Sequence, residues 1–166
     1  MIEDKVEAAD FDRFVSVGRL DEATTGLLIL TTDGGMVHSL ASPEAKVAKR
    51  YEVTTARRLT DEAVQRLRIG VEIELETNGD IETYITAPAE AAIESDGRLR
   101  LVINEGKKRQ IRRMVSAVGG EVVALHRRAI GRLDLRDHRL NQGDVLDISN
   151  QDVLAMVGVD VEDKRP

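Results

Sequence analysis

The stretch that decides the fold is residues 18–34, Gly-Arg-Leu-Asp-Glu-Ala-Thr-Thr-Gly-Leu-Leu-Ile-Leu-Thr-Thr-Asp-Gly. Its apolar run Leu27–Leu30 has no polar face, which predicts a strand buried on both sides. Turn and helix-start residues bound this run. Asp21 therefore lies on a loop fixed to the core, where catalytic groups are often found. The local pattern leaves an alternative in which Asp21 caps a turn and pairs with Arg19, because Asp is a common turn residue.

The whole composition is that of one globular domain. The chain has 166 residues, with 42% hydrophobic and 33% charged residues and only 2% aromatic residues. It has no cysteine, which excludes disulfides and thiolate metal sites and fits a reducing compartment. The three histidines show no metal-ligand spacing, and no apolar run reaches membrane-spanning length. Because the N-terminus also lacks the features of a signal peptide, we expect a soluble, cytoplasmic protein that binds neither metal nor membrane.

The charge is unevenly distributed along the chain. The net charge is −6, yet residues 98–132 hold ten Lys and Arg against two Glu. A basic patch on an acidic body is typical of a surface that binds anions such as nucleic acid. The alternative, a solvated mixed-charge face, fits less well because so few acids balance these cations. The ten are Arg98, Arg100, Lys107, Lys108, Arg109, Arg112, Arg113, Arg127, Arg128 and Arg132.

The order of elements predicts an α+β fold with a mixed, largely antiparallel sheet flanked by a few helices, because strands outnumber helices and do not alternate with them. Residues 1–16 form an N-terminal arm, 17–150 the main domain and 151–166 a polar tail. Hydrophobic periodicity and capping residues predict helices over 34–41, 60–69 and 104–118. Alternation and β-formers predict strands over 49–55, 71–75, 82–87, 90–93, 99–103, 122–125 and 144–148.

Two of these elements carry residues suited to nucleic acid. In the helix ending at Val118, the apolar stripe that begins at Ile111 places Arg109, Arg112 and Arg113 on the flanks and outer face. Tyr51 follows two cations on a strand. It either packs in the core or offers an aromatic plane to a base, as in proteins that bind single-stranded RNA.

Three motifs in this order resemble the RsuA-like family of ribosomal RNA pseudouridine synthases. They are Gly18-Arg19-Leu20-Asp21, then Lys49-x-Tyr51, and finally residues 105–114, which are followed later in the sequence by Leu125-x-Arg127. The resemblance implies the pseudouridine synthase catalytic fold over residues 17–150. It also implies an isomerase that converts a specific uridine of ribosomal RNA to pseudouridine without a metal or cofactor.

The resemblance also implies a role for each motif residue. Asp21 would be the catalytic residue, attacking the sugar C1′ or removing a proton from C2′. Arg112 would pair with Asp21, keep it ionised and fix its orientation. Tyr51 and Leu125 would form a slot for the uracil flipped out of its stack, and Arg19 would hold the nucleotide or its phosphate. The remaining cations would grip the RNA backbone: Lys49, Lys107, Lys108, Arg109, Arg113 and Arg127.

The chain departs from the family mildly at Thr31-Thr32-Asp33-Gly34, where many relatives have Thr-Asn-Asp-Gly, and more strongly ahead of the Asp motif. The family's N-terminal S4-type RNA-binding domain and the strand containing Lys-Pro ahead of the Asp motif are not found in it. We therefore expect a natural short form or a truncated one, whose sheet an oligomer or a partner could complete. These departures leave open a second function, that of a catalytically impaired RNA-binding or ribosome-associated remnant. The sequence does not name the target uridine or the ribosomal subunit.

Overall fold

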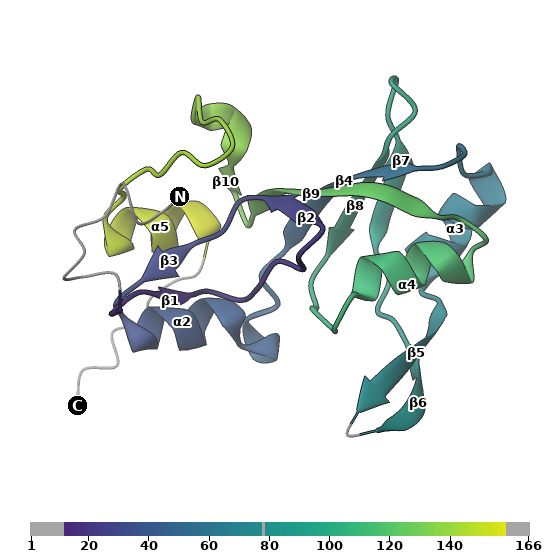
Figure 1. The fold of residues 1–166 in the computed structure, drawn as a ribbon, viewed down its shortest axis with the longest axis horizontal. Helices are drawn as coiled ribbons and strands as arrows, with labels where there is room; N and C mark the ends of the chain where they lie inside the picture. The colour runs from purple at the N-terminus through teal and green to yellow at the C-terminus, as the bar shows by residue number, and fades with distance from the viewer. Residues whose placement is uncertain (1–11, 78, 159–166) are drawn as a thin grey trace.

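The computed structural model describes residues 12–77 and 79–158. Its centre is a six-stranded sheet in which the long strand β9 (Val122–Ile130) lies between β10 (Leu133–Asp134) and β4 (Lys49–Thr55). Beyond β4, the order continues with β8 (Leu99–Ile103) and β7 (Glu90–Ile93). These neighbours pair antiparallel, whereas β2 (Thr24–Gly26) pairs parallel with β9. The expected α+β fold with a largely antiparallel sheet is therefore confirmed (Figure 1).

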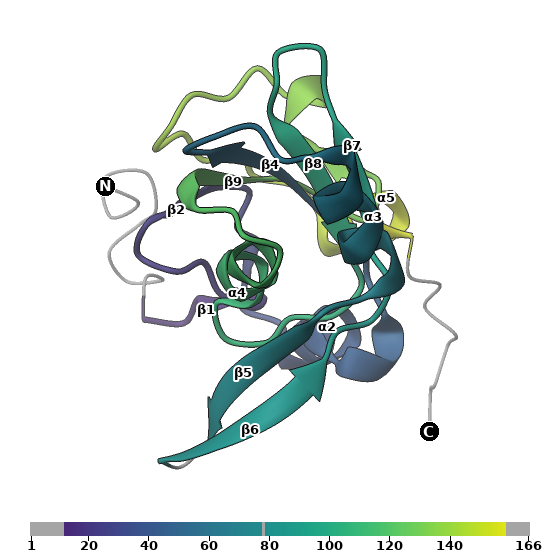
Figure 2. The ribbon, with the colours of Figure 1, turned by 90° about the vertical axis from the view of Figure 1, so that its right-hand side faces the viewer.

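Two small antiparallel sheets and the helices flank this centre. The first small sheet pairs β1 (Val15–Ser16) with β3 (Leu30–Thr31), and the second pairs β5 (Glu72–Thr77) with β6 (Asp80–Ile85). The β5–β6 hairpin projects away from the rest of the molecule (Figures 1 and 2). The α-helices are α2 (Gly34–Ala41), α3 (Asp61–Ile69), α4 (Gln110–Ala117) and α5 (Asn150–Val157), and the 3₁₀ turns are η2 (Pro43–Ala45) and η3 (Leu135–Asp137).

Two hydrophobic clusters hold these elements together. The larger one packs α3 and α4 against β4, β8 and β9, and its most deeply buried side chains include Leu67, Leu99 and Met114. The smaller one, around Leu40 and Ile130, joins α2 and α5 to the end of β9 and to Val17 and Ile29, which lie next to β1 and β3. Strand β9 therefore contributes to both clusters and links the two halves of the protein.

Several local predictions are confirmed. Helix α2 covers the predicted residues, and the Asp33 carboxylate caps it by accepting hydrogen bonds from the backbone N–H groups of Gly35 and Met36. Helix α3 begins after Thr60, which caps it, and ends at Gly70. Strands β4, β7 and β8 have the expected bounds. In each case the deciding signal lies inside the element or at its ends.

The buried strand predicted over 27–30 is wrong. Only Ile29 is buried, and the chain is divided between β2, which joins the central sheet, and β3, which pairs with β1. The division occurs at Gly26, whose φ of 110° lies in the region that glycine favours. A β-carbon there would lie 2.1 Å from the Arg127 carbonyl oxygen, so the chain turns where only glycine fits against β9.

Further boundaries differ from prediction, among them that of β9, which continues to Ile130 and does not end at residue 125. Residues 104–109 are not helical, and α4 begins at Gln110 after Arg109, which has a left-handed φ of 55°. Residues 144–148 form no strand, since they run along the surface outside the ladders of the sheets and leave Leu146 45% exposed. Residues 151–157, assigned to the tail, belong to α5, because Ser149 caps a segment whose Val153 and Val157 reach the smaller cluster.

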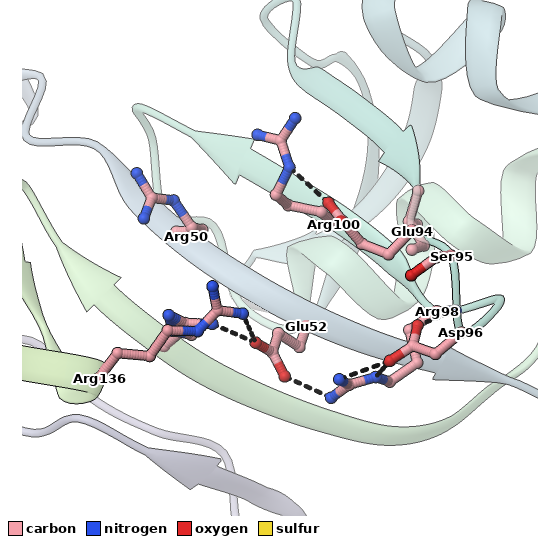
Figure 3. A pocket seen from close by; sticks show the side chains of 10 residues that line it. Arg50, Glu52, Glu94, Ser95, Asp96, Arg98, Arg100 and Arg136 are labelled. Carbon is pink, nitrogen blue, oxygen red and sulfur yellow. Dashed lines mark hydrogen bonds and ion pairs between the residues drawn. The ribbon is translucent and has the colours of Figure 1, made fainter. Parts of the chain in front are cut away.

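The two faces of the central sheet differ in chemistry. On β4, the side chains of Lys49, Tyr51 and Val53 share one face, while Arg50 and Glu52 alternate onto the other. The first face carries α4 and an open cleft, described below. The second face carries a network of arginines and carboxylates around a cavity of about 570 Å³ (Figure 3).

Glu52 is at the centre of this network. Its carboxylate accepts hydrogen bonds from Arg98 and from Arg128, the latter at 2.6 Å, and the Arg128 side chain is only 7% exposed. Arg128 also donates to Asp134 at 2.8 Å. Burial by itself would raise the pKa of Glu52, but the hydrogen bond from Arg128 and the neighbouring positive charges outweigh it and lower that pKa. The network therefore joins β4, β8, β9 and β10 through charge.

We expect Glu52→Gln to lower the free energy of unfolding by about 1–2 kcal/mol near neutral pH, because charged hydrogen bonds to Arg128 are lost. A carboxyl group with a lowered pKa stabilises the fold above its unfolded pKa of about 4.3 and loses this effect as the pH falls through its folded pKa. Urea unfolding should therefore show the difference from wild type at about pH 7 and a smaller one at about pH 3.

Glu90→Gln is the matched control, because Glu90 lies on the same face with its side chain 77% exposed and 3.7 Å from Arg100. We expect its free energy of unfolding to change by less than about 0.5 kcal/mol. An equal loss in the Glu52 and Glu90 variants, or a Glu52 effect independent of pH, would contradict this assignment.

Within the described residues, no helix is long and apolar enough to cross a bilayer.

Candidate active site

A cleft of about 1190 Å³ opens on the face of the sheet that carries α4. Its walls come from the loop before β2, the strands β4 and β9, and the loop that leads into α4. Strand β6 and the residues that follow it extend the lining with Tyr84, Ala87 and Pro88. Nine of the eleven site residues predicted from the sequence line it, although they are spread over more than a hundred positions. They are Arg19, Asp21, Lys49, Tyr51, Lys107, Lys108, Arg109, Leu125 and Arg127.

Asp21 lies between β1 and β2 in a tight turn, in which the Thr24 N–H donates to the Asp21 carbonyl oxygen at 2.8 Å. Its side chain is half-buried in the cleft. Among residues 12–77 and 79–158, no group forms a hydrogen bond or ion pair with the Asp21 carboxylate. The alternative in which it pairs with Arg19 therefore finds no support, and the carboxylate is available to a ligand.

Two arginines hold the Asp21 loop through its backbone. Arg127 donates from Nε to the Leu27 carbonyl oxygen at 2.8 Å and from Nη1 to the Arg19 carbonyl oxygen at 3.1 Å. Arg112 donates from Nη2 to the Ala23 carbonyl oxygen at 2.8 Å. Three carbonyl groups before, within and after the turn are thus fixed from β9 and α4. A catalytic group on a loop requires such fixing, since small misplacements lower rates strongly.

These contacts differ from the roles that the resemblance implies. Arg112 lies outside the lining of the cleft and bonds the carbonyl oxygens of Ala23 and Val122, not the Asp21 carboxylate. Arg113 also lies outside that lining. Arg127 is 3% exposed, so its contacts in this structure are to the protein backbone. Arg128, its neighbour in sequence, points to the opposite face of the sheet and is enclosed by Glu52 and Asp134.

Tyr51 and Leu125 lie on the two central strands beside the Asp21 loop. In the register of β4 with β9, Tyr51 is opposite Arg127 and Val53 is opposite Leu125. Leu125 is 6% exposed, whereas Tyr51 is half-buried with the larger cluster behind it. Together they give the cleft an apolar and aromatic floor of the kind that can hold a planar ring.

The cleft also has an excess of positive charge. Arg19, Lys46, Lys49, Lys107, Lys108, Arg109 and Arg127 line it, against Asp21, Glu22 and Glu105. Burial and then the charge of Arg127 lower the pKa of Lys49 below its ordinary value, because two cations lie together inside the cleft. One nitrogen of Arg127, Nη2, is buried without a hydrogen-bond partner. This electrostatic environment favours a negatively charged ligand.

No cluster of His, Asp and Glu suited to a metal ion occurs in the described part of the chain.

Comparison with known proteins identifies the family. The family model described as RNA pseudouridylate synthase matches residues 2–117, more than half of the chain. The chain belongs to this family. The matched residues include Asp21, Tyr51 and Arg112, whereas Leu125 and Arg127 follow them on β9.

Individual relatives agree with this membership. The chain is 35% identical over 139 residues to ribosomal small subunit pseudouridine synthase A of Vibrio cholerae, covering 84% of this chain and 57% of the relative. It is 38% identical over 140 residues to the uncharacterized RNA pseudouridine synthase YtzG of Bacillus subtilis, covering 82% and 55%. The chain thus spans just over half the length of these curated relatives.

The fold of the family is also found in a solved structure. A crystal structure of a pseudouridylate synthase superposes with a TM-score of 0.81 at 32% identity, covering 95% of this chain and 65% of that one. The pseudouridine synthase fold expected from the three motifs is therefore confirmed.

Two chemically relevant residues that line the cleft were missed by the sequence analysis. Tyr84, on β6, and Lys46, after η2, both line the cleft. Lys46 carries no signal in the sequence, because it is one lysine in a polar turn. Tyr84 does carry one: a chain with two tyrosines in total has little aromatic side chain to place, and the structure places both in the cleft.

Proposed function

We propose that this chain is the catalytic part of an RNA pseudouridine synthase that isomerises a uridine of small-subunit ribosomal RNA, with Asp21 as the catalytic residue. The observation that carries the proposal is the Asp21 carboxylate, unpaired among the described residues and presented to a cationic cleft by a loop fixed at three carbonyl groups. The curated names of several relatives, which specify the ribosomal small subunit, support the choice of RNA.

The reaction needs little more than this arrangement. The bond between C1′ and N1 of uridine breaks, the uracil turns, and C1′ bonds to C5, whose proton is lost while N1 gains one. Asp21 starts the sequence either by bonding to C1′ or by taking the C2′ proton. The atoms of substrate and product are the same, so no oxidant, reductant or second substrate enters.

The walls of the cleft account for the other requirements. A uridine inside folded RNA must leave its stack to reach a carboxylate at the base of a cleft. Tyr51 and Leu125 offer the extruded uracil an aromatic face and an apolar contact. Exposed cations on the loop before α4, Lys107, Lys108 and Arg109, are placed to contact flanking phosphates.

A modification map tests the proposed function. Pseudouridine is mapped in both ribosomal RNAs from cells with and without the gene, and the purified chain is then incubated with RNA from the deletion strain. We expect one small-subunit position to be unmodified in the deletion strain and to be restored by the chain. Identical maps, together with no restored position, would remove the catalytic assignment and favour a protein that only binds RNA.

Salt dependence tests the role of the exposed cations. We expect Lys108→Ala to weaken RNA binding and to reduce the slope of log K against log salt by about 0.7, since one phosphate contact to single-stranded RNA is lost. Filter binding across a salt series measures the slope. Arg136→Ala is the matched control, because Arg136 is 74% exposed on the opposite face of the sheet and should leave the slope unchanged. Equal effects in both variants would argue against the cleft as the RNA site.

A further inference from the structure

Tyr84 is an aromatic side chain whose position the proposed chemistry does not explain. It lies on β6 in the projecting hairpin, opposite the buried Ile73 of β5, and it is half-buried in the wall of the cleft. Aromatic residues make up only 2% of the chain, and a ring in the core would bury more apolar area than one in an open wall. Part of the ring packs against the larger hydrophobic cluster, and the part that stays exposed in the wall of the cleft is available to a ligand.

The hydroxyl group of Tyr84 is hydrogen-bonded to Glu105, on the loop that leads into α4. It donates to Glu105 Oε2 at 2.6 Å, and Glu105 Oε1 accepts from the Ala87 N–H at 3.0 Å and from the Gln110 side chain. The Gln110 Oε1 in turn accepts from the Lys107 N–H at 2.8 Å. The hydrogen bond to Glu105 raises the pKa of Tyr84, so the phenol stays protonated. The ring is therefore held in one orientation before any ligand arrives.

Lys107 adds a positive charge to this ring. Its Nζ lies 4.9 Å from the centre of the Tyr84 ring, within the range of a cation–π contact. Because Nζ lies over the ring, a base that stacks on that side takes the place of the ammonium group, which can then contact the phosphate of the same nucleotide. The sequence analysis assigned Lys107 to the RNA backbone, and its position beside Tyr84 gives that contact a definite location.

The opposite face of the hairpin is unsuited to RNA. Glu72, Glu74 and Glu76 lie in register with Ile85, Thr83 and Ile81, and all six side chains are exposed. Three carboxylates in a row repel a phosphate backbone. The face that carries Tyr84 also has Glu82 and Asp80 toward the tip of the hairpin, but it adjoins the cations of the cleft. RNA is therefore expected to approach the hairpin on this face, near Tyr84.

We propose that Tyr84 and Lys107 form a second nucleotide subsite, which stacks a base adjacent to the target uridine and so positions the RNA across the cleft. The inference rests on the proposed function in one respect, that the cleft binds RNA. It adds a contact that sets RNA affinity and leaves the chemical step at Asp21 unchanged.

Fluorescence anisotropy with a fluorescein-labelled short oligouridylate tests the subsite. We expect Tyr84→Leu to raise Kd about tenfold, because stacking of one base is lost. Tyr84→Phe keeps the ring and should bind nearly as wild type, although it lacks the hydrogen bond to Glu105. The same oligonucleotide with abasic riboses is the control probe: wild type and Tyr84→Leu should bind it equally, since it offers no base to stack.

The outcomes separate the subsite from a structural role and from the proposed function. If Tyr84→Phe and Tyr84→Leu weaken RNA binding equally, base stacking is contradicted and the hydrogen bond to Glu105 is what matters. If Tyr84→Leu weakens binding of both probes equally, stacking is contradicted as well, and Tyr84 has only a structural role. Failure of wild type to bind the oligouridylate would also overturn the subsite. If wild type restores pseudouridine and Tyr84→Leu binds RNA normally, the subsite alone fails. If the Tyr84 series behaves as expected but no pseudouridine forms, the catalytic assignment alone fails.

Discussion

Replacing Asp21 by Asn should lower the rate of pseudouridine formation by about 10⁴-fold or more, because the amide can neither bond to C1′ as a nucleophile nor take a proton from C2′. The side chain keeps its size, so the loop held by Arg112 and Arg127 should keep its conformation. We expect Kd for RNA to stay within about threefold of wild type, since one charge in a cleft rich in cations contributes little to binding. Single-turnover assays with RNA from the deletion strain, alongside filter binding, measure the two quantities separately.

Glu22 provides the control, because it is a second carboxylate in the lining of the same cleft, one position along the chain. Glu22→Gln removes the same charge and should retain nearly full activity. If Glu22→Gln inactivates the protein as strongly as Asp21→Asn, the effect is one of cleft charge and not of a specific catalytic group. If Asp21→Asn remains active, the assignment of Asp21 is wrong.

The sequence predicts well what is decided locally. Helix α3 could be placed because Thr60 and Gly70 mark its ends and Ala63, Val64 and Leu67 form its buried stripe. Strand β8 could be placed because Arg98 and Arg100 alternate with Leu99 and Leu101 at its start and β-branched residues complete it. The motif residues could be brought together because the resemblance to the family, and not their local pattern, relates positions far apart in the chain.

The failures at Leu27–Leu30 and at the two arginines of β9 have one physical origin, which is pairing between distant segments. Leu27–Leu30 reads as a strand, but its path depends on how closely Gly26 approaches Arg127 on β9. Arg127 and Arg128 look alike as neighbouring cations, and alternation along a strand puts them on opposite faces. Which of them faces the cleft depends on the register of β9 against β4, which has an irregularity next to Tyr51. No pattern within residues 122–130 decides which arginine faces the cleft, because each finds its partners more than five positions away.

That register changes what Arg127 is expected to do. As an RNA contact, it would add affinity through its charge. As a buried side chain bonded to the carbonyl groups of Arg19 and Leu27, it would instead hold Asp21 where the sugar arrives. The two roles predict different results for the same substitutions, since a phosphate contact acts on Kd and the salt slope, whereas a positioning contact acts on the chemical step.

We expect Arg127→Met and Arg127→Lys both to lower the single-turnover rate at saturating RNA by about a hundredfold, because neither side chain can span the two carbonyl groups. The lysine variant keeps the charge, which guards against a loss of folding in the methionine variant, and both should keep the salt slope of wild type. Lys108→Met is the control and should show the reverse, weaker binding with a normal rate at saturation. If Arg127→Lys keeps the wild-type rate while Arg127→Met lowers RNA affinity and the salt slope, Arg127 acts as a phosphate contact. In that case Arg112 is the residue that holds the Asp21 loop in position.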